Sequence, residues 1–403
     1  MKFSTNWEKV FAITGLLSLF IIYSLLWVRM INTPVERTGS DFIGLFSGAR
    51  LSQLHGYSAM YDIEKQQNLQ AEVVGFEFHP DQTGYFTHPP FIVPLVRLIS
   101  TDDYTTSLTR WTIILLALNA LTVFVLLHTL PKDRFSKSET WILGLGALLF
   151  TPTFSGLMNG QDTAVLMLGA AVWVYQIFND KPFLAGLGLS LSTIRPQMAI
   201  LYTIPFLFKH RRVFLGAVIG GLGLAIFSLL LIGPSQLPDY LNIIQVVESG
   251  MWNLPHATDM PTLSGILRRN FEQMDQTIYR NIIWSAFFVS INAISIWWKK
   301  SKQITEKHIG LLILLGLLLV PYAHYHELSI LLIPMFCLIR IWSQNGLVPA
   351  KKMILMPIAI SLALLFGFIN FANVKYIIVY AIILFLGYAM LYPRKIAMQF
   401  IKI

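Results

Sequence analysis

The sequence has almost no cysteine and few charged residues. Cys337 is the only cysteine, so an intramolecular disulfide framework is excluded. Charged residues make up 13% of the 403 residues and hydrophobic residues 55%, with a mean hydropathy of +0.61. A soluble chain of this length cannot bury so much apolar surface. The composition therefore predicts a polytopic membrane protein.

The sequence also lacks the short motifs of nucleotide-binding and hydrolase sites. No Walker or dinucleotide glycine motif follows a predicted strand, and neither HExxH nor GxSxG occurs. A cytosolic nucleotide-binding site is therefore not supported. The net charge of +9 would suggest nucleic acid as the partner of a soluble protein, but basic cytoplasmic turns explain it better in a membrane protein. We expect no nucleic acid partner.

Long apolar runs predict an all-α protein with about twelve membrane segments. The segments lie near 9–30, 104–130, 140–156, 163–178, 182–193, 196–208, 212–232, 281–298, 306–321, 325–343, 353–370 and 374–391. The first run is too long for a signal-peptide core and lacks a small-residue cleavage site, so we expect it to be retained. We expect one domain over 1–403. It consists of a core module at 1–232 that carries the loop 31–103, and of variable helices at 233–403 with an outer loop at 233–280.

Two apolar stretches are too short or too interrupted to cross simply. The stretch 89–99 is short, and we interpret it as a surface or re-entrant helix. The stretch 182–208 is broken at Arg195-Pro196 and has basic turns on both sides, with Lys181 before it and Lys209 after it. Because basic turns favour the cytoplasmic side, this pattern predicts a helical hairpin with Arg195-Pro196 at its outer tip.

The charge pattern predicts a topology with both termini in the cytoplasm. The inner turns are then short and basic, whereas the outer segments carry most of the acids. Five outer segments result, at 41–88, 159–162, 195–196, 233–280 and 321–327. Since the inner face has no room for a domain, any chemistry is expected on the outer, extracytoplasmic side of the cell membrane.

Asp41 is the leading catalytic candidate. It follows the first membrane segment closely and precedes apolar residues at helical spacing, so Ser40 is predicted to cap an amphipathic helix on the membrane surface. The positive end of that helix favours an ionised carboxylate, which could act as general base on an acceptor hydroxyl. The alternative is that Asp41 simply stabilises the first turn of the helix.

Arg195 is the second candidate. A cation between two apolar half-helices is costly at membrane depth and needs a partner. Its planar fork matches the geometry of phosphate. The alternative is an arginine that snorkels to the membrane surface.

Further polar residues lie in the predicted outer segments. Asp162 could be a second acid or a helix cap, and His88 could face the site or only begin the surface helix. The turn His324, His326 and Glu327 could hydrogen-bond a sugar or phosphate, bind a metal, or be ordinary interfacial residues. We favour no metal and no other cofactor. Arg268 and Arg269 could bind an anionic lipid headgroup, such as the phosphate of a lipid-linked donor, or form a solvated basic pair.

The order of motifs in the first half of the chain resembles that of a known family. Asp41-Phe42, Gly48-Ala49-Arg50, Met60-Tyr61-Asp62 and Phe86-Thr87-His88-Pro89-Pro90 resemble the first loop of the GT-C glycosyltransferases. Asn159-Gly160-Gln161, Ile194-Arg195-Pro196 and Lys209-His210-Arg211-Arg212 are most similar to glycosyltransferase family 87. The resemblance is best over about the first 230 residues, by the order of motifs rather than by any single one.

The resemblance implies a GT-C fold and a mechanism. Family members move a sugar, often mannose, from a polyprenyl phosphate to a lipid or glycan acceptor with inversion. By position Asp41 would be the general base and Arg195 would bind the donor phosphate, although Lys is more frequent there in the family. His88, Gln161, Asp162, Tyr61 and the turn at 324–327 would line the substrate site, with Tyr57, Tyr85, Phe86 and Trp252 as further rings for sugar stacking.

Two other classes of function stay open from the sequence. A transporter or flippase of lipid-linked saccharides could use the same outer acids and cations without bond cleavage. Against it, only one broken segment occurs, and no pair of matching halves is visible. A scaffold subunit of an envelope-assembly complex is the third alternative.

Overall fold

A computed structural model describes residues 6–38, 40–77, 83–248, 257–347, 350–370 and 372–402, and all regular elements in these ranges are helical. The first part of the chain forms α1 (Asn6–Asn32), α2 (Pro34–Thr38), α3 (Phe42–His55), η1 (Tyr57–Ala59), α4 (Ile63–Val74), η3 (Pro90–Ile92), α5 (Val93–Ile99) and α6 (Tyr104–Leu127). The middle part forms α7 (Lys137–Leu148), α8 (Thr151–Met158), α9 (Thr163–Phe178), α10 (Pro182–Ser190), η4 (Leu191–Ile194), α11 (Pro196–Lys209) and α12 (Arg211–Ile232).

The last part of the chain continues the bundle. It forms η5 (Pro234–Gln236), α13 (Leu237–Glu248), α15 (Leu263–Asn270), α16 (Gln276–Lys300), α17 (Glu306–Leu319), η6 (Tyr325–Leu331), α18 (Leu332–Gln344), α19 (Ala350–Met353), α20 (Met356–Asn370), α21 (Ala372–Leu391) and α22 (Pro393–Lys402). The main hydrophobic core runs through all three parts, from Met30 to Ala397.

Six helices of the described chain are long and apolar enough to cross a membrane. They are Trp7–Asn32, Tyr104–Leu127, Arg211–Ile232, Gln276–Lys300, Tyr325–Gln344 and Val374–Leu391. The pair α7 and α8, bent by 46°, would make a seventh. Of the twelve predicted segments, 163–178, 182–193 and 353–370 form apolar helices of 10–17 residues, each too short to pass the same test. The all-helical membrane class is confirmed, and the number of twelve crossings stays a prediction.

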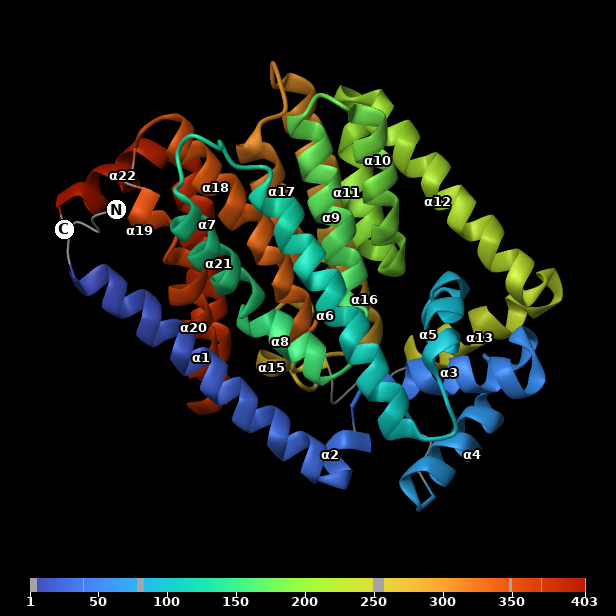
Figure 1. Ribbon diagram of the computed structural model, residues 1–403. Helices are drawn as coiled ribbons and strands as arrows, with labels where there is room; N and C mark the ends of the chain where they lie inside the picture. The colour runs from blue at the N-terminus through green and yellow to red at the C-terminus, as the bar shows by residue number, and fades with distance from the viewer. Residues whose placement is uncertain are drawn as a thin grey trace.

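The chain breaks where the hairpin was predicted. α10 continues into η4, and η4 and α11 meet at Arg195, whose backbone (φ −125°, ψ 85°) leaves the helical region. α10 begins and α11 ends at the same end of the bundle, as the hairpin prediction requires (Figure 1). α10 packs closely on α12 because Gly186 and Gly216 have no side chains, and a Cβ at Gly186 would lie 2.1 Å from the Val213 carbonyl oxygen.

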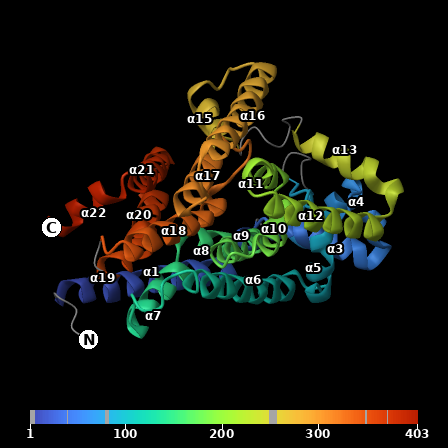
Figure 2. The ribbon, with the colours of Figure 1, turned by 90° about the horizontal axis from the view of Figure 1, so that it is seen from above.

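The first outer loop is a packed body of helices. α3, α4 and α13 gather on the side of the molecule away from both termini (Figure 1), and the view from above also places α13 beside them (Figure 2). The stretch 89–99 forms η3 and the seven-residue α5, so it is a short helix as predicted.

α3 differs from the amphipathic surface helix that was predicted. The residues from Phe42 to Ala49 are buried on every face of the helix, because Tyr104 of α6 and Phe86 of the loop cover it. The predicted Ser40 cap is wrong: the Ser40 hydroxyl lies 2.9 Å from the Tyr104 hydroxyl, and no side chain caps α3. The apolar face therefore serves the packing of the protein rather than a membrane surface.

Candidate functional site

The structure joins four of the five predicted outer segments around Arg195. Its guanidinium lies 2.9 Å from Asp162 (Nη2 to Oδ1) and 2.9 Å from Glu327 (Nε to Oε1). Its Nη1 lies 3.3 Å from His88 Nδ1, and its Nη2 donates to Gln161 Oε1 over 3.2 Å. The partner that a cation between two half-helices requires is thus a pair of carboxylates, each from a different part of the chain.

Asp162 is a fully buried carboxylate held by two cationic or potentially cationic groups. It precedes α9 and has no exposed surface. Burial alone raises its pKa, but Arg195 and then His88, whose Nδ1 lies 2.8 Å from Oδ2, lower the pKa to about 2. Asp162 is therefore a permanent counter-charge of Arg195 at neutral pH.

Glu327 is the second counter-charge and connects the late turn to the cluster. Its Oε1 lies 3.1 Å from His326 Nε2, and its Oε2 accepts a hydrogen bond from the His324 amide over 2.6 Å. These bonds fix the carboxylate at the start of η6, where it faces Arg195. The turn at 324–327, which the sequence left between three interpretations, has its glutamate in the cluster around Arg195.

Asp41 lies at the solvent-exposed edge of this cluster. Its Oδ2 accepts a hydrogen bond from Gln161 Nε2 over 2.6 Å, and Gln161 is itself bonded to Arg195. The backbone joins the same two segments, because the Phe42 amide donates to the Asn159 carbonyl over 3.0 Å. Asp41 is exposed, whereas Asp162 and Glu327 are buried. Of these three acids, Asp41 is the one open to an incoming acceptor.

The turn that carries Gln161 has a backbone geometry that requires glycine. Gly160 has a positive φ of 65°, and a Cβ there would lie 2.6 Å from the Phe42 Cβ. The Trp111 indole donates to the Gly160 carbonyl over 2.7 Å. This turn brings the Gln161 amide between Asp41 and Arg195.

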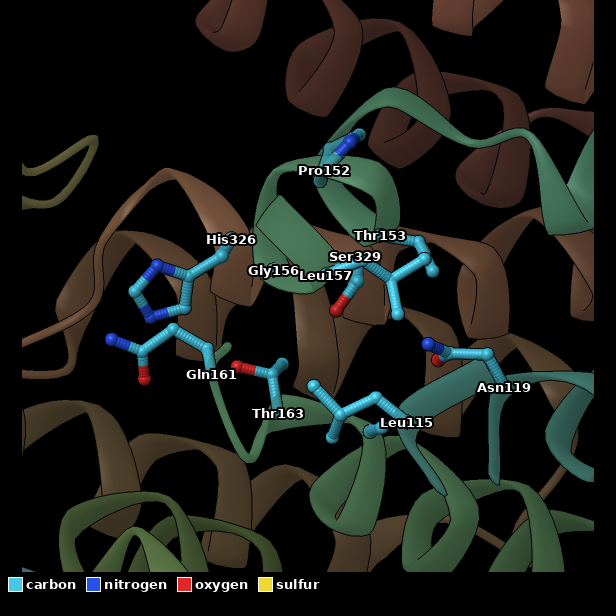
Figure 3. Close-up of a pocket in the computed structure, with 11 residues that line it drawn as sticks. Leu115, Asn119, Pro152, Thr153, Gly156, Leu157, Gln161, Thr163, His326 and Ser329 are labelled. Atoms are coloured by element: carbon cyan, nitrogen blue, oxygen red, sulfur yellow. The ribbon is translucent and has the colours of Figure 1, made fainter. Parts of the chain in front are cut away.

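A small cavity lies behind Gln161 and His326 (Figure 3). Its volume is about 10 Å³, which is roughly the space of one water molecule. The hydroxyls of Thr153, Thr163 and Ser329 are buried at its wall and have no hydrogen-bond partner within the described protein. These groups give the inner side of the cluster a polar lining.

Two predicted phosphate ligands lie in another environment. The Arg268 guanidinium lies over the Tyr279 ring (3.9 Å to the centroid) and donates to Gln276. Arg269 donates to the Thr258 and Met260 carbonyls over 2.6 and 2.9 Å and lies over the Tyr376 ring. These contacts hold α15 against α16 and α21, and none of them involves the cluster around Arg195.

The aromatic residues proposed for sugar stacking are mostly buried. Tyr61, Tyr85 and Phe86 belong to the core, and Tyr61 donates from its hydroxyl to the His88 carbonyl over 2.7 Å. The Arg97 guanidinium carbon lies over the Tyr57 ring, 4.8 Å from the ring centroid. Trp252 lies outside the described residues. Tyr61 thus contacts the His88 backbone through its hydroxyl, while its side chain is almost completely buried.

No group of three or more His, Cys, Asp or Glu side chains within the described ranges could hold a metal ion. The chemistry available in the cluster is that of an exposed carboxylate, a buried cation with two counter-charges, and neighbouring imidazoles. This set suits proton transfer and the binding of a polar or anionic substrate.

A comparison with family models decides the broad class. The model of glycosyltransferase family 87 matches residues 86–321, more than half of the chain. The chain belongs to glycosyltransferase family 87. It is therefore a membrane glycosyltransferase of the GT-C superfamily, which acts on a sugar donor and an acceptor. A search of curated proteins finds no match.

The matched range contains part of the cluster. His88, Gln161, Asp162 and Arg195 lie within it, whereas Asp41 precedes it and Glu327 follows it. The sequence resemblance is best over about the first 230 residues; the family match covers the later part of that range, from residue 86, and continues to residue 321, just past the end of α17. The contacts of Asp41 and Glu327 with matched residues place both acids at the same site.

Sequence reasoning missed how Gln161 works. The sequence predicts Gln161 as part of the motif Asn159-Gly160-Gln161 and as a residue that lines the substrate site, but no local pattern indicates that its amide connects Asp41 to Arg195. The glycine before it was the available signal, because a glycine in a polar turn between two apolar runs often marks a positive φ.

Proposed function

We propose that this glycosyltransferase transfers a sugar, mannose by preference, from a polyprenyl-phosphate donor to a lipid or glycan acceptor, with Asp41 as general base. The observation that carries the proposal is the position of Asp41: an exposed carboxylate, oriented by Gln161, beside a buried Arg195 cluster. A base must be reachable by the acceptor, and its orientation must be fixed.

The proposed reaction is a single displacement with inversion. The acceptor hydroxyl attacks the anomeric carbon while Asp41 takes its proton. The bond between that carbon and the phosphate oxygen breaks, and the polyprenyl phosphate leaves with the electron pair. A cation near the phosphate stabilises the charge that develops on the leaving oxygen.

Arg195, with His88 beside it, is the proposed binding group for the donor phosphate. Its side chain is only 13% exposed and already faces two carboxylates, so the phosphate would join an existing charge network. His88 lies within hydrogen-bond distance of the same guanidinium, so its imidazole is a second polar group beside the proposed phosphate position. The proposal assigns no phosphate contact to Arg268 or Arg269, because their guanidinium groups hold α15 in place.

The proposed location of the site is the extracytoplasmic face of the cell membrane, with both termini in the cytoplasm. The contacts between the segments predicted to lie outside support this topology. Asp41, Gln161, Arg195 and Glu327 join four of these segments, and Ser264 of the fifth donates to the Pro321 carbonyl.

The test is sugar transfer from a panel of radiolabelled polyprenyl-phosphate sugars in membranes that contain wild type, Asp41→Asn or Asp102→Asn. Asparagine keeps the shape of Asp41 but takes no proton, so transfer should fall by roughly a hundredfold or more while the donor still binds. Asp102 lies in the same loop with its side chain 87% exposed, and its variant should transfer normally. Equal transfer by wild type and Asp41→Asn would refute the base. Flux of lipid-linked sugar without release from the donor would instead indicate a flippase.

A further inference from the structure

A second, larger cavity lies between the first loop and α13. Its volume is about 550 Å³, within the range of pockets that bind small molecules. It opens between the end of α3, the start of α4 and the α13 segment, which Figure 1 and Figure 2 both show side by side. Its walls are formed by His55, Ser58, Ala59, Tyr61, Asp62, Ile63, Glu64, Lys65, Gln236, Asp239 and Asn242. We call this cavity the α13 groove.

The walls of the α13 groove are polar. Ala59 and Ile63 are the two wall residues without a polar side-chain group. Carboxylate, amide and hydroxyl groups hydrogen-bond readily to the hydroxyls of a saccharide, which both donate and accept. A prenyl chain, by contrast, would leave these groups without partners. The lining therefore fits a saccharide and excludes the lipid tail of the donor.

The charges of the α13 groove argue against a phosphate. Lys65, the one lysine or arginine in the wall, pairs with Asp62 over 2.6 Å. The two other acids of the wall are Glu64 and Asp239, and the remaining titratable groups are His55 and the Tyr61 phenol. A phosphate would meet like charges there. Neutral sugar units meet no such penalty.

The α13 groove is joined to the candidate active site through Tyr61. Tyr61 forms part of the groove wall, and its ring lies against the ring of Tyr240 of α13, with 4.9 Å between centroids. On the other side its hydroxyl donates to the His88 carbonyl, and His88 contacts Asp162. Tyr61 thus contacts both the α13 groove and His88 of the cluster around Arg195.

The far end of the α13 groove is distant from Asp41. Asp41 precedes α3 and His55 ends it, and a helix of fourteen residues is about 21 Å long. The groove cannot hold the reacting hydroxyl at its far end. The groove can hold sugar units of the same acceptor that are linked to the reacting sugar. The binding energy of these sugar units then positions the reacting hydroxyl.

We propose that the α13 groove binds the saccharide part of an extended acceptor, several sugar units away from the transfer site. This inference rests on the proposed function, because it needs an acceptor that is glycosylated at Asp41. The groove would then select acceptors that already carry sugars over a bare lipid. The reaction that supplies this acceptor is an earlier glycosylation of the same molecule.

The experiment is saturation-transfer NMR on the full-length protein in detergent with mannotriose and maltotriose as probes. The test variant is Asp239→Ala/Asn242→Ala, which alters two exposed side chains of α13 that line the groove. The matched control is Gln245→Ala, an exposed polar side chain on the same helix outside the groove wall. Loss of about two hydrogen bonds should weaken trisaccharide binding roughly tenfold.

A trisaccharide signal in wild type that weakens in the α13 variant, but not in Gln245→Ala, would support the α13 groove as the binding site. No signal in wild type with either probe, or equal signals in wild type and the α13 variant, would overturn it. Asp41→Asn separates this inference from the proposed function: it should keep the trisaccharide signal and lose transfer. A protein that binds the trisaccharide but transfers no sugar from any donor would overturn the transfer reaction and leave the groove as a saccharide site.

Discussion

The Gln161 amide connects Asp41 to Arg195, with its nitrogen 2.6 Å from Asp41 Oδ2 and its oxygen 3.2 Å from Arg195 Nη2. An amide has one donor side and one acceptor side, so these two bonds fix its orientation. The exposed acid and the buried cation are therefore held in one geometry by a single neutral side chain.

Replacement of Gln161 by leucine should lower kcat about tenfold to a hundredfold with little change in the KM for the donor. The reason is that a hydrogen bond to a charged group contributes roughly 1.5–3 kcal/mol, and this one orients the proposed base. Steady-state kinetics in membranes measure kcat and the KM for the donor separately. Gln197→Leu is the matched control, because the Gln197 amide donates to the Tyr322 carbonyl in the same region and does not contact Asp41. A normal kcat in Gln161→Leu would show that Asp41 needs no such support.

The charge network around Arg195 predicts a large stability effect from a single substitution. Arg195→Gln leaves two buried carboxylates without their cation, which typically costs about 3–5 kcal/mol. The unfolding temperature in detergent, read by size-exclusion chromatography after heating, should fall markedly. Adding Asp162→Asn should restore part of the loss, because one of the two uncompensated charges is then gone.

A surface ion pair gives the comparison for this prediction. Arg50 pairs with Asp102, whose side chain is 87% exposed, and Arg50→Gln should change stability by at most about 1 kcal/mol. Equal shifts in unfolding temperature for Arg195→Gln and Arg50→Gln would contradict the view that the Arg195 network is buried and coupled.

The sequence predicted the class of the protein and proposed Asp41 and Arg195 as candidate site residues, but it could not predict their contacts. Apolar runs and the broken segment at Arg195 follow from local composition, since a helix needs about 20 apolar residues to cross. The pairing of Arg195 with Glu327 joins residues more than a hundred positions apart, and no local pattern encodes such a distance.

The same limit explains the errors at α3. Its apolar spacing was interpreted as a membrane-facing stripe, because hydrophobic periodicity shows that a face is buried but not what covers it. Tyr104 and Phe86, which cover it, come from later in the chain. The Ser40 hydroxyl likewise hydrogen-bonds to the Tyr104 hydroxyl, a partner from later in the chain, instead of capping α3.

Asp162 predicts an acid-dependent component of stability. Its pKa is about 2 in the folded protein and near 3.8 when unperturbed, so the folded state favours the ionised form. The stabilisation is fully present above about pH 4 and is lost as the pH falls through about 2. The unfolding temperature of wild type, measured in detergent at fixed ionic strength, should therefore fall more steeply with decreasing pH over this range than that of Asp162→Asn. Asp102→Asn, which alters an exposed acid, should follow wild type; identical curves for wild type and Asp162→Asn would rule out the pairing.

The turn at Gly160 predicts a sharp difference between two glycine-to-alanine substitutions. Gly160→Ala would place a Cβ 2.6 Å from the Phe42 Cβ and force an alanine to a φ of 65°, which together should cost about 2–4 kcal/mol. Because the turn positions the Gln161 amide between Asp41 and Arg195, kcat should fall as well, even at temperatures where the variant is folded. Gly221→Ala is the control: its Cβ would meet only the Thr193 Cγ2 at 3.5 Å inside α12, where alanine favours helix over glycine. Unfolding temperature and single-turnover transfer, measured on both variants, test the two effects separately. A Gly160→Ala protein as stable and active as Gly221→Ala would mean that the turn can shift without moving Gln161 from Asp41.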